Sequence, residues 1–226
     1  MTRLFDILFS AIAIMLILPL IILIALFLKL TGEHEILYRQ KRIGRYGKPF
    51  EVLKFATMLR DSPNMNGGLI TCPNDPRLLP LGKYLRKTKI NELPQLINVL
   101  FGQMSVVGYR PFAEMHYNLY SKEVKERINR IRPGITGVGS IIFKNEEEIL
   151  HAVQDKEHMH DKIITPYKGQ LESWYVENRT LFCYFALIFL TVEAFVRPGN
   201  KTIFNIFKDL PPCPPELEDY LSGSEI

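Results

Sequence analysis

Residues 7–28 read ILFSAIAIMLILPLIILIALFL, an apolar stretch without a single charged side chain. An α-helix of about 22 residues, at about 1.5 Å per residue, is about 33 Å long and can cross a hydrocarbon core of about 30 Å. No small-x-small cleavage site follows the stretch, which continues into Lys29-Leu30, so a cleaved signal peptide is disfavoured. The stretch therefore predicts a helix embedded in a membrane.

Pro19 lies in the middle of this stretch. Proline removes one backbone hydrogen bond from a helix and clashes with the preceding turn. The two arms, residues 7–18 and 20–28, each reach about half the depth of a bilayer, so a kinked hairpin can enter and leave by one face. Spanning helices also tolerate proline, and Arg3 and Lys29 place positive charge at both ends. Physical chemistry alone leaves the spanning and re-entrant topologies equally open.

The remainder of the chain has the composition of a polar, folded domain. The net charge of +4 over 226 residues is too weak to indicate nucleic acid binding and is compatible with an anionic lipid surface. Cys72, Cys183 and Cys213 are widely spaced and form no CxxC pair, so neither a disulfide framework nor a zinc site is indicated. These features favour a reducing, cytosolic environment.

Periodicity and turn residues predict the first elements of this domain. Short strands over residues 36–38 and 50–53 flank a glycine-bearing connection and predict a hairpin. Residues 61–80 are rich in Gly, Asn, Asp and Pro, so they predict a long loop of the kind that is often functional. Residues 81–101 predict one helix, whose apolar face would be formed by Leu93, Leu96, Ile97, Leu100 and Phe101.

Further helices are predicted towards the C-terminus. Residues 117–131 predict a charged amphipathic helix, and a helix opening at residue 146 is followed by a polar one that reaches Tyr175. Residues 181–196 are apolar except for Thr191 and Glu193, which favours an interfacial or core helix over a second membrane span. Trp174 and Tyr175 suit a membrane interface and a protein core equally well. The proline-rich end of the chain predicts a poorly ordered tail.

The densest group of unusual residues lies between residues 83 and 111. Arginines there stand beside rigid Pro and Gly residues, as in Gly108-Tyr109-Arg110-Pro111, which suggests guanidinium groups fixed to grip phosphate. An acidic residue among such cations suits a magnesium ion shared with phosphates. For any single arginine, an ordinary surface pair is at least as good an explanation. For the whole set that explanation is weaker.

Several segments recur in a familiar order. They are Phe5-Asp6-Ile7 before the proline-broken stretch, KFATM at 54–58, DPR at 75–77, LRKT at 85–88, ELPQLINVL at 92–100, MSVVGYRP at 104–111 and RPGITG at 132–137. Together they closely resemble the bacterial sugar transferase family, the monotopic phosphoglycosyl transferases. The resemblance runs from Arg3 to about Val196, and residues 92–111 are its most specific part. The short chain resembles the minimal catalytic form of that family.

The resemblance implies a mainly α fold with a small β-hairpin, of the α+β class. A re-entrant membrane helix, broken at Pro19, and amphipathic interfacial helices would pack on a small cytoplasmic catalytic domain. The chain would divide into a membrane helix over residues 1–30, a catalytic domain over 31–200 and a C-terminal tail over 201–226. The implied location is the bacterial inner membrane, with the active site on its cytoplasmic face.

The resemblance also implies a reaction. Such enzymes move a phospho-sugar from a UDP-sugar to polyprenol (undecaprenyl) phosphate, release UMP and start the assembly of a lipid-linked glycan. Their mechanism is ping-pong: an aspartate attacks the sugar-bearing phosphate, and the lipid phosphate then attacks the covalent intermediate. The expected cofactor is Mg²⁺, and the expected partners are UDP-sugar, polyprenol phosphate and membrane lipids. Nucleic acid is not expected, a homodimer stays open, and the sequence does not identify the sugar.

The resemblance carries the family's functional positions onto this chain residue by residue. Glu92 matches the glutamate that binds magnesium, and Arg86 and Arg110 match arginines that bind phosphate. The remaining substrate-binding positions are Lys54, Asp75, Arg77 and Arg132, which would shape the site. Pro19 matches the proline at the hinge of the re-entrant helix.

Three positions depart from the family's pattern. Leu18 stands where the family usually has serine, which removes a hydroxyl able to satisfy the broken backbone at Pro19. Ala56 stands where arginine is common. The third departure, Asn91, matters most, because the family has its nucleophilic aspartate here and a neutral amide is a poor nucleophile.

Asn91 leaves three explanations open. The aspartate was replaced deliberately to trap an inactive state, another residue such as Glu92 is the nucleophile, or the chain is an inactive homologue retained for binding. The sequence therefore predicts catalytic positions at Asn91 and Glu92, with the activity of this particular chain undecided. The rival hypothesis from another class is a non-catalytic membrane scaffold that binds nucleotide sugar or polyprenol phosphate.

Overall fold

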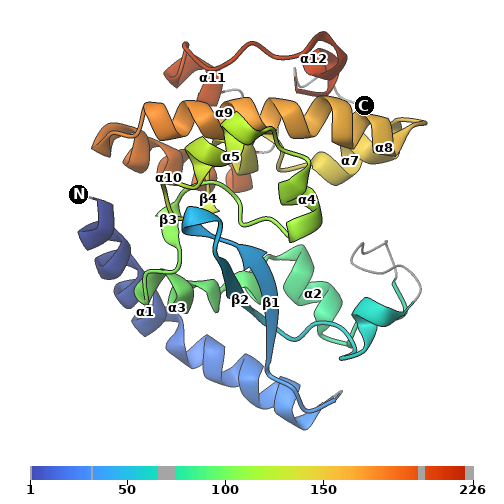
Figure 1. Ribbon diagram of the computed structural model, residues 1–226. Coiled ribbons are helices and arrows are strands. Elements are labelled where there is room, and N and C mark those ends of the chain that lie inside the picture. The colour runs from blue at the N-terminus through green and yellow to red at the C-terminus, as the bar shows by residue number, and fades with distance from the viewer. Residues whose placement is uncertain (1, 32, 66–74, 198–201, 222–226) are drawn as a thin grey trace. The chain divides into compact units, whose positions relative to one another are not determined.

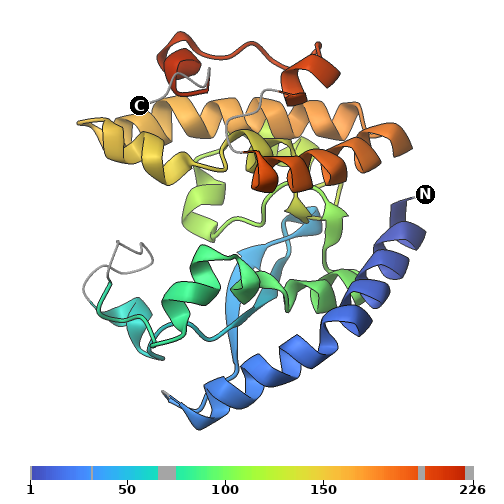
Figure 2. The same ribbon diagram turned by 180° about the vertical axis from the view of Figure 1, so that it is seen from behind.

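The computed structural model describes residues 2–31, 33–65, 75–197 and 202–221 (Figures 1 and 2). The described residues form a mainly helical α+β fold with two-stranded sheets, as the sequence predicts. The chain packs as two compact units. The C-terminal unit contains residues 1–6, 42–50 and 102–226, and the N-terminal unit contains residues 7–41 and 51–101. The sequence predicts different boundaries, at residues 30 and 200, which separate the parts of the chain by expected function. This division stays a prediction.

Helix α1 (Thr2–Leu30) starts in the C-terminal unit and continues through the N-terminal unit. Its most apolar 18-residue window has a mean hydropathy of 3.2, and only 11% of that window is buried. The core helix of a soluble protein would be buried, so this exposure makes α1 a candidate membrane helix. The backbone stays helical through Pro19, and the ribbon bends midway (Figure 1), as an interior proline kinks a helix. The predicted break is therefore a bend.

The second half of α1 packs against the N-terminal unit. Ile24 and Leu28, which are 6% and 1% exposed, join Phe55 and Leu85 in a buried apolar cluster. The partly buried residues around this cluster are Ile21, Ile36, Leu81 and Ile90. Positions 21, 24 and 28 lie on one face of a helix, so a single stripe of α1 makes these contacts. The remaining faces leave large apolar side chains exposed.

The predicted hairpin is confirmed. Strands β1 (Leu37–Ile43) and β2 (Pro49–Phe55) pair in a two-stranded sheet, and the 3₁₀ turn η1 (Arg45–Gly47) joins them. A connection this short allows only antiparallel pairing. Tyr46 (φ 62°) and Gly47 (φ 67°) both adopt the left-handed conformation, which reverses the chain within the turn. A second 3₁₀ turn, η2 (Ser62–Asn64), follows β2.

The single helix predicted over residues 81–101 is wrong. The structure has α2 (Gly82–Lys87), the 3₁₀ turn η3 (Ile90–Glu92) and α3 (Gln95–Leu100) in its place. The interruption occurs at Lys89, whose φ of 58° lies outside the right-handed helical region. The predicted apolar face is wrong too. Gln95, Asn98 and Val99 point inward, and Phe101 is 77% exposed.

The C-terminal unit contains a parallel pair of strands that the sequence did not predict. Strand β3 (Ser105–Val107) pairs with β4 (Gly134–Thr136), with Ser105 opposite Gly134 and Val107 opposite Thr136. The two backbones approach closely. A Cβ at Gly134 would lie 2.1 Å from the Gly108 nitrogen, so only glycine fits there. This pairing places the GYRP and RPGITG segments side by side.

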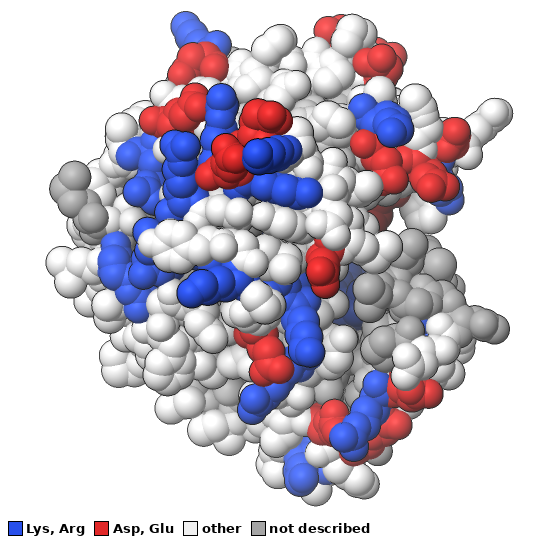
Figure 3. Space-filling model, in the orientation of Figure 1, with Lys and Arg blue, Asp and Glu red and all other residues white. Residues whose placement is uncertain are grey.

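Helices make up most of the C-terminal unit. Those after β3 are α4 (Glu114–Asn118), α5 (Lys122–Ile128), α6 (Val138–Ile142), α7 (Glu146–Ala152), α8 (Lys156–His158), the π-helical turn η4 (Met159–Ile164), α9 (Thr165–Glu177), α10 (Leu181–Val196), α11 (Thr202–Ile206) and α12 (Pro215–Leu221). The helix predicted over residues 117–131 is divided into α4 and α5. Both signs of charge alternate over α5 (Figure 3), as expected of a solvated face.

The long helices α9 and α10 supply the core of this unit. Trp174 and Tyr175 on α9 are 8% and 1% exposed, which places both in the core rather than at an interface. Helix α10 buries one face and exposes the other. Its buried residues are Cys183, Tyr184, Leu187 and Leu190, and its exposed apolar residues include Phe182, Phe189, Val192, Phe195 and Val196. An interfacial position for the exposed face stays a prediction.

The expectation of a poorly ordered tail is wrong for residues 202–221. Ile203, Phe207 and Leu217 are buried, and Phe207 packs edge-on against Trp174. Asp209 accepts a hydrogen bond from the Trp174 indole nitrogen at 3.0 Å. Three apolar side chains therefore dock this segment despite its prolines. Residues 222–226 lie outside the described part of the chain.

Candidate active site

Asn91 and Glu92 lie together on the short turn η3, between α2 and α3. Asn91 is 6% exposed, and no described residue hydrogen-bonds to its side-chain oxygen. A buried polar atom without a partner costs free energy, so the Asn91 oxygen needs an explanation. Glu92 is half-buried beside it. The turn thus holds one unsatisfied amide oxygen and one carboxylate at the two positions predicted as catalytic, whose roles stay predictions.

Lys54 on β2 approaches the same turn. Its Nζ lies 3.0 Å from Glu92 Oε1, and the two side chains are only 19% and 18% exposed. A charge-assisted contact in such a setting is stronger than one at the surface. The ion pair joins the hairpin to the turn, so two segments 38 residues apart in the sequence contribute to one site.

Asn98 on α3 holds β2 in place for this contact. Its Nδ2 donates to the Glu51 carbonyl at 2.8 Å, and its Oδ1 accepts from the Leu53 N–H at 3.0 Å. The side chain pairs with the edge of β2 as a neighbouring strand would. Asn98 is 1% exposed, so water cannot replace these bonds. Lys54 follows Leu53 directly, and its position therefore depends on Asn98.

We expect Asn98→Ala to lower the stability of the chain by about 1–3 kcal/mol, because it leaves two backbone groups of β2 without partners. The variant Asn98→Asp keeps the acceptor for Leu53, but it places a buried carboxylate against the Glu51 carbonyl. Its loss should therefore be at least as large, as measured by the melting temperature in detergent. Equal stability of Asn98→Ala and the unaltered chain would contradict this account of β2.

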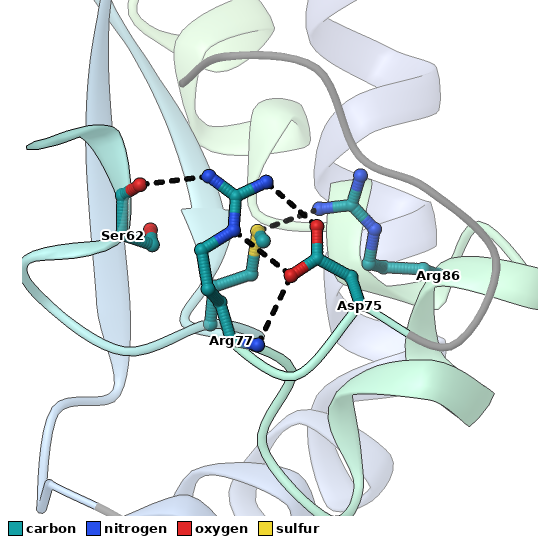
Figure 4. A network of polar contacts seen from close by, with 5 residues as sticks. Ser62, Asp75, Arg77 and Arg86 are labelled. Atoms are coloured by element: carbon teal, nitrogen blue, oxygen red, sulfur yellow. Dashed lines mark hydrogen bonds and ion pairs between the residues drawn. The ribbon is translucent and has the colours of Figure 1, made fainter. Parts of the chain in front are cut away.

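Asp75 and Arg77 form a buried ion pair with each other (Figure 4). The Arg77 Nη2 and Nε donate to the two carboxylate oxygens at 2.6 and 2.8 Å, and Nη1 donates to the Ser62 carbonyl at 2.9 Å. Their side chains are 4% and 2% exposed. The pair ties η2 to residues 75–77. This geometry favours a supporting role, and direct contact of the pair with substrate stays a prediction.

Arg86 on α2 lies in the same unit (Figure 4). Its side chain is half-buried, and Nη1 donates to the Met58 sulfur at 3.5 Å. A thioether is a weak acceptor, so this contact orients the guanidinium without neutralising it. The N-terminal unit therefore contains six of the predicted site residues: Lys54, Asp75, Arg77, Arg86, Asn91 and Glu92.

Arg110 and Arg132 belong to the C-terminal unit. Arg110 follows β3 and has an exposed side chain. Arg132 precedes β4 and donates from Nε to the Gly102 carbonyl at 2.6 Å. Burial, together with the nearby guanidinium groups of Arg45 and Arg3, lowers the pKa of Arg132. Cations therefore gather around Arg132, as a site for an anion requires.

Glu172 on α9 is a residue that sequence reasoning missed. It is 2% exposed, and its Oε2 has no hydrogen-bond partner among the described residues. Burial raises the pKa of Glu172 to about 8, although Lys168 opposes that change. The sequence contains one sign that Glu172 is buried: it directly follows Leu171 and comes five residues after Tyr167, and both of these face inward. That sign is weak, because a glutamate in a polar helix usually lies at the surface.

Asp6 is the second missed residue, although its tripeptide formed part of the resemblance. It is 1% exposed within the C-terminal unit. Its carboxylate accepts hydrogen bonds from Ser105 Oγ, the Val106 N–H and the Tyr184 hydroxyl, all at 2.9 Å. Three donors from β3 and α10 thus hold the first turns of α1.

The side chains present suit magnesium only in part. Among the described residues, no group of three or more His, Cys, Asp or Glu side chains is arranged to hold a metal ion. Magnesium, however, is commonly held by one or two protein oxygens, with substrate phosphates and water completing its octahedron. Glu92 offers a carboxylate, and the unpartnered Asn91 oxygen offers a second hard donor. This donor set fits Mg²⁺ when a diphosphate supplies further ligands.

Comparison with known proteins places the chain among its relatives. The family model for bacterial sugar transferases matches residues 1–198. The exopolysaccharide production protein ExoY of Rhizobium meliloti (strain 1021) is 31% identical over 206 residues, which cover 85% of this chain and 84% of that protein. The uncharacterized sugar transferase EpsL of Bacillus subtilis (strain 168) is 35% identical over 192 residues, covering 84% of this chain and 85% of that protein.

A longer relative bears a more specific name. The UDP-glucose:undecaprenyl-phosphate glucose-1-phosphate transferase of Klebsiella pneumoniae is 36% identical over 193 residues, which cover 84% of this chain. This chain spans only 39% of that enzyme's length, and 33% of the enzyme of the same name from Escherichia coli (strain K12). The match over residues 1–198 and the relatives of similar length agree with the motifs read from the sequence: this chain belongs to the bacterial sugar transferase family.

Proposed function

We propose that this chain is built as a phosphoglycosyl transferase, which moves a phospho-sugar from a UDP-sugar to polyprenol phosphate and releases UMP. The observation that carries the proposal is the turn η3, where Asn91 and Glu92 lie side by side and Lys54 pairs with Glu92. Relatives named for transfer of sugar phosphate to undecaprenyl phosphate support it. The sugar itself remains open.

The proposed mechanism has two displacements at one phosphorus atom. An aspartate carboxylate at position 91 attacks the sugar-bearing phosphorus, the bond to the bridging oxygen breaks, and UMP leaves with the electron pair. An oxygen of polyprenol phosphate then attacks the same phosphorus and displaces the carboxylate. Arg86 and Arg110 bind phosphate oxygens and offset the charge that develops. Magnesium held by Glu92 and the diphosphate would stabilise the leaving UMP.

Asn91 removes the nucleophile from this scheme. The amide occupies the position of the carboxylate, but it cannot form the acyl phosphate directly. This observation favours a second candidate function, a membrane scaffold that binds the nucleotide sugar or the lipid phosphate without transferring anything. Binding and turnover separate the two candidates.

A double-label experiment tests the proposed function. The protein and its Asn91→Asp variant, in nanodiscs with polyprenol phosphate and Mg²⁺, are given UDP-sugars that carry ³²P in the β-phosphate and ³H in the sugar. Phosphoglycosyl transfer moves both labels into the lipid fraction in equal amounts. Tritium without ³²P would reveal simple glycosyl transfer and refute the proposal. Binding of UDP-sugar by both proteins with neither label transferred would favour the scaffold.

The bend of α1 bears on its topology. Pro19 lies inside the helix, and the ribbon bends midway along it (Figure 1). Each of the two arms reaches about half the depth of a bilayer. This bend supports the proposal that α1 is re-entrant and lies on the cytoplasmic membrane with both ends at the cytoplasmic face.

Cysteine labelling in intact cells tests this topology. In a background with Cys72, Cys183 and Cys213 replaced by serine, we expect Thr2→Cys to react with an impermeant thiol reagent only after the cells are lysed. Lys122→Cys, on the exposed helix α5, is the matched control for the cytoplasmic domain. Labelling of Thr2→Cys but not Lys122→Cys in intact cells would restore a spanning helix.

A further inference from the structure

Two arginine side chains from distant parts of the sequence meet at Gly102. A Cβ built at Gly102 would lie 3.2 Å from Arg3 Nη2 and 3.4 Å from Arg3 Cζ, so this guanidinium group lies against the glycine backbone. Arg132 donates from Nε to the Gly102 carbonyl at 2.6 Å. Gly102 has a φ of 80°, which strains any residue with a side chain. The glycine therefore leaves room for Arg3 beside Arg132, and all three residues belong to the C-terminal unit.

A third arginine approaches Arg132 from the hairpin turn η1. Arg45 donates from Nε to the Arg130 carbonyl at 3.1 Å, and the Tyr46 N–H donates to the Asn129 carbonyl at 2.9 Å. These bonds hold η1 against the residues that lead directly into Arg132. The side chain of Arg45 is half-buried. The fold, rather than a mobile surface side chain, therefore sets the position of this third cation.

The cluster of Arg3, Arg45 and Arg132 carries an excess of positive charge. Among the described residues, Arg45 and Arg132 donate hydrogen bonds to protein groups only through Nε. Asp6 opposes the charge around Arg132, but its carboxylate already accepts hydrogen bonds from three protein donors. Burial and the two neighbouring guanidinium groups lower the pKa of Arg132. An anion from outside the chain would offset the remaining charge.

The surroundings of this cluster indicate that the anion belongs to a lipid. Arg3 lies in the first turn of α1, the candidate membrane helix, and its neighbour Leu4 is 71% exposed. Arg45 packs over the ring of Tyr46, with Cζ 4.5 Å from the ring centroid, and Tyr46 is 63% exposed. Tyrosine is enriched at membrane–water interfaces, and arginines near the ends of membrane helices reach the head groups there. The anions of that region are lipid phosphates.

We propose that Arg3, Arg45 and Arg132 form a binding site for the phosphate group of an anionic membrane phospholipid. A phosphodiester presents its negative charge on unesterified oxygens, which the planar fork of arginine matches. The site gives the anion beside Arg132 a chemical class, and it holds a lipid molecule against the start of α1. The proposal rests on the membrane position of α1 and is independent of the transfer reaction.

Native mass spectrometry of the full chain in detergent, titrated with phosphatidylglycerol, tests the site. Arg3→Gln and Arg45→Gln should each raise the Kd of the most tightly bound lipid roughly tenfold, the effect of one lost charge-assisted bond. Lys122→Gln is the matched control, because it removes the same charge from a side chain of this unit that is 86% exposed. Its Kd should stay within about twofold of the unaltered chain. Equal Kd values for Arg45→Gln and Lys122→Gln would overturn the proposal.

Arg45→Lys separates the charge from a purely structural role. Lysine keeps the positive charge but loses the Nε bond to the Arg130 carbonyl, as glutamine does. Phosphatidylglycerol should therefore bind more tightly to Arg45→Lys than to Arg45→Gln. Equal weakening in both variants would show that the bond to Arg130 matters and the charge does not, which would overturn the site. If neither variant folds, Arg3→Gln, which leaves η1 unaltered, gives the same comparison with Lys122→Gln.

Three further ligands identify the source of the phosphate. Dioleoylglycerol, which lacks phosphate, should bind less tightly than phosphatidylglycerol and should not respond to Arg45→Gln. Excess inorganic phosphate should leave phosphatidylglycerol bound, because it lacks acyl chains. Equally tight binding of dioleoylglycerol, or displacement of the lipid by inorganic phosphate, would overturn the assignment to a phospholipid. Displacement by an equal amount of polyprenol phosphate would also overturn it and would assign the cluster to the acceptor lipid.

Binding of UDP-sugar separates this site from the proposed function. The Kd for UDP-sugar should be the same in Arg45→Gln and in the unaltered chain. Weaker UDP-sugar binding with unchanged phosphatidylglycerol binding would assign the cluster to the nucleotide and overturn the proposal. Phosphatidylglycerol binding that depends on Arg45, in a chain whose Asn91→Asp variant transfers no sugar phosphate, would leave the lipid site standing and refute only the proposed function.

Discussion

Replacing Asn91 by aspartate should raise the rate of UMP release by roughly 10⁴-fold or more, the scale of loss when an enzyme lacks its nucleophile. Asparagine and aspartate have nearly the same shape, and the Asn91 side-chain oxygen already lies in place without a partner among the described residues. The exchange therefore supplies a nucleophile without repacking the turn η3. Lys54, bound to Glu92, offsets the additional negative charge beside that glutamate.

The measurement is UMP release from a panel of UDP-sugars with polyprenol phosphate and Mg²⁺. Asn91→Ala is the matched control, since it removes the amide without adding a carboxylate and should leave the rate where the unaltered chain has it. Equal activity of the unaltered chain and Asn91→Asp would show that aspartate is not required, and Glu92→Gln would then identify Glu92 as the alternative nucleophile. Inactivity of both would favour the scaffold.

Removing Asp75 should have the largest effect on stability. In Asp75→Ala the Arg77 guanidinium, 2% exposed, loses both of its carboxylate contacts and stays charged in a buried position. Breaking a buried ion pair in this way costs about 3–5 kcal/mol, which corresponds to a fall of roughly 10 °C in melting temperature for a chain of this size. Removing both partners in Asp75→Ala/Arg77→Met should cost less than removing Asp75 alone.

A surface ion pair provides the comparison. Arg39 and Glu51 lie 3.5 Å apart with side chains 68% and 47% exposed, so Arg39→Ala should change the melting temperature little. A substrate role for the buried pair would give a different pattern. An unchanged melting temperature for Asp75→Ala, combined with a much higher KM for UDP-sugar, would contradict the supporting role drawn from Figure 4.

The parts of the fold that depend on local pattern could be predicted. The apolar run of α1 and the hairpin around Gly44–Lys48 follow from hydrophobicity and turn residues alone. Strands β3 and β4 could not, because three residues beside glycines show no alternation, and their pairing rests on contact between Gly108 and Gly134. The helix over residues 81–101 failed at Lys89, whose left-handed backbone no periodicity reveals.

The candidate site also has parts that the sequence could predict and parts that it could not. Motif resemblance located Glu92 and Lys54 but did not pair them, because the contact depends on how Asn98 holds β2. The resemblance placed Asp75 and Arg77 among the residues that shape the site, and their mutual burial appears only in three dimensions. Glu172 had only a weak local signal, its place beside the inward-facing Leu171, and its burial appears only in three dimensions.

The hydrogen bonds of Asp6 also set an order of assembly during biosynthesis. Tyr184, one of its donors, is added to the chain 178 residues after Asp6. At about 5–20 residues per second, a ribosome needs roughly 10–35 s to make the intervening segment. In the proposed topology, helix α1 emerges and meets lipid during this interval, before its donor from α10 exists. Membrane entry would then precede the last of the Asp6 hydrogen bonds, and synthesis of α10 would complete the attachment of α1 to the C-terminal unit.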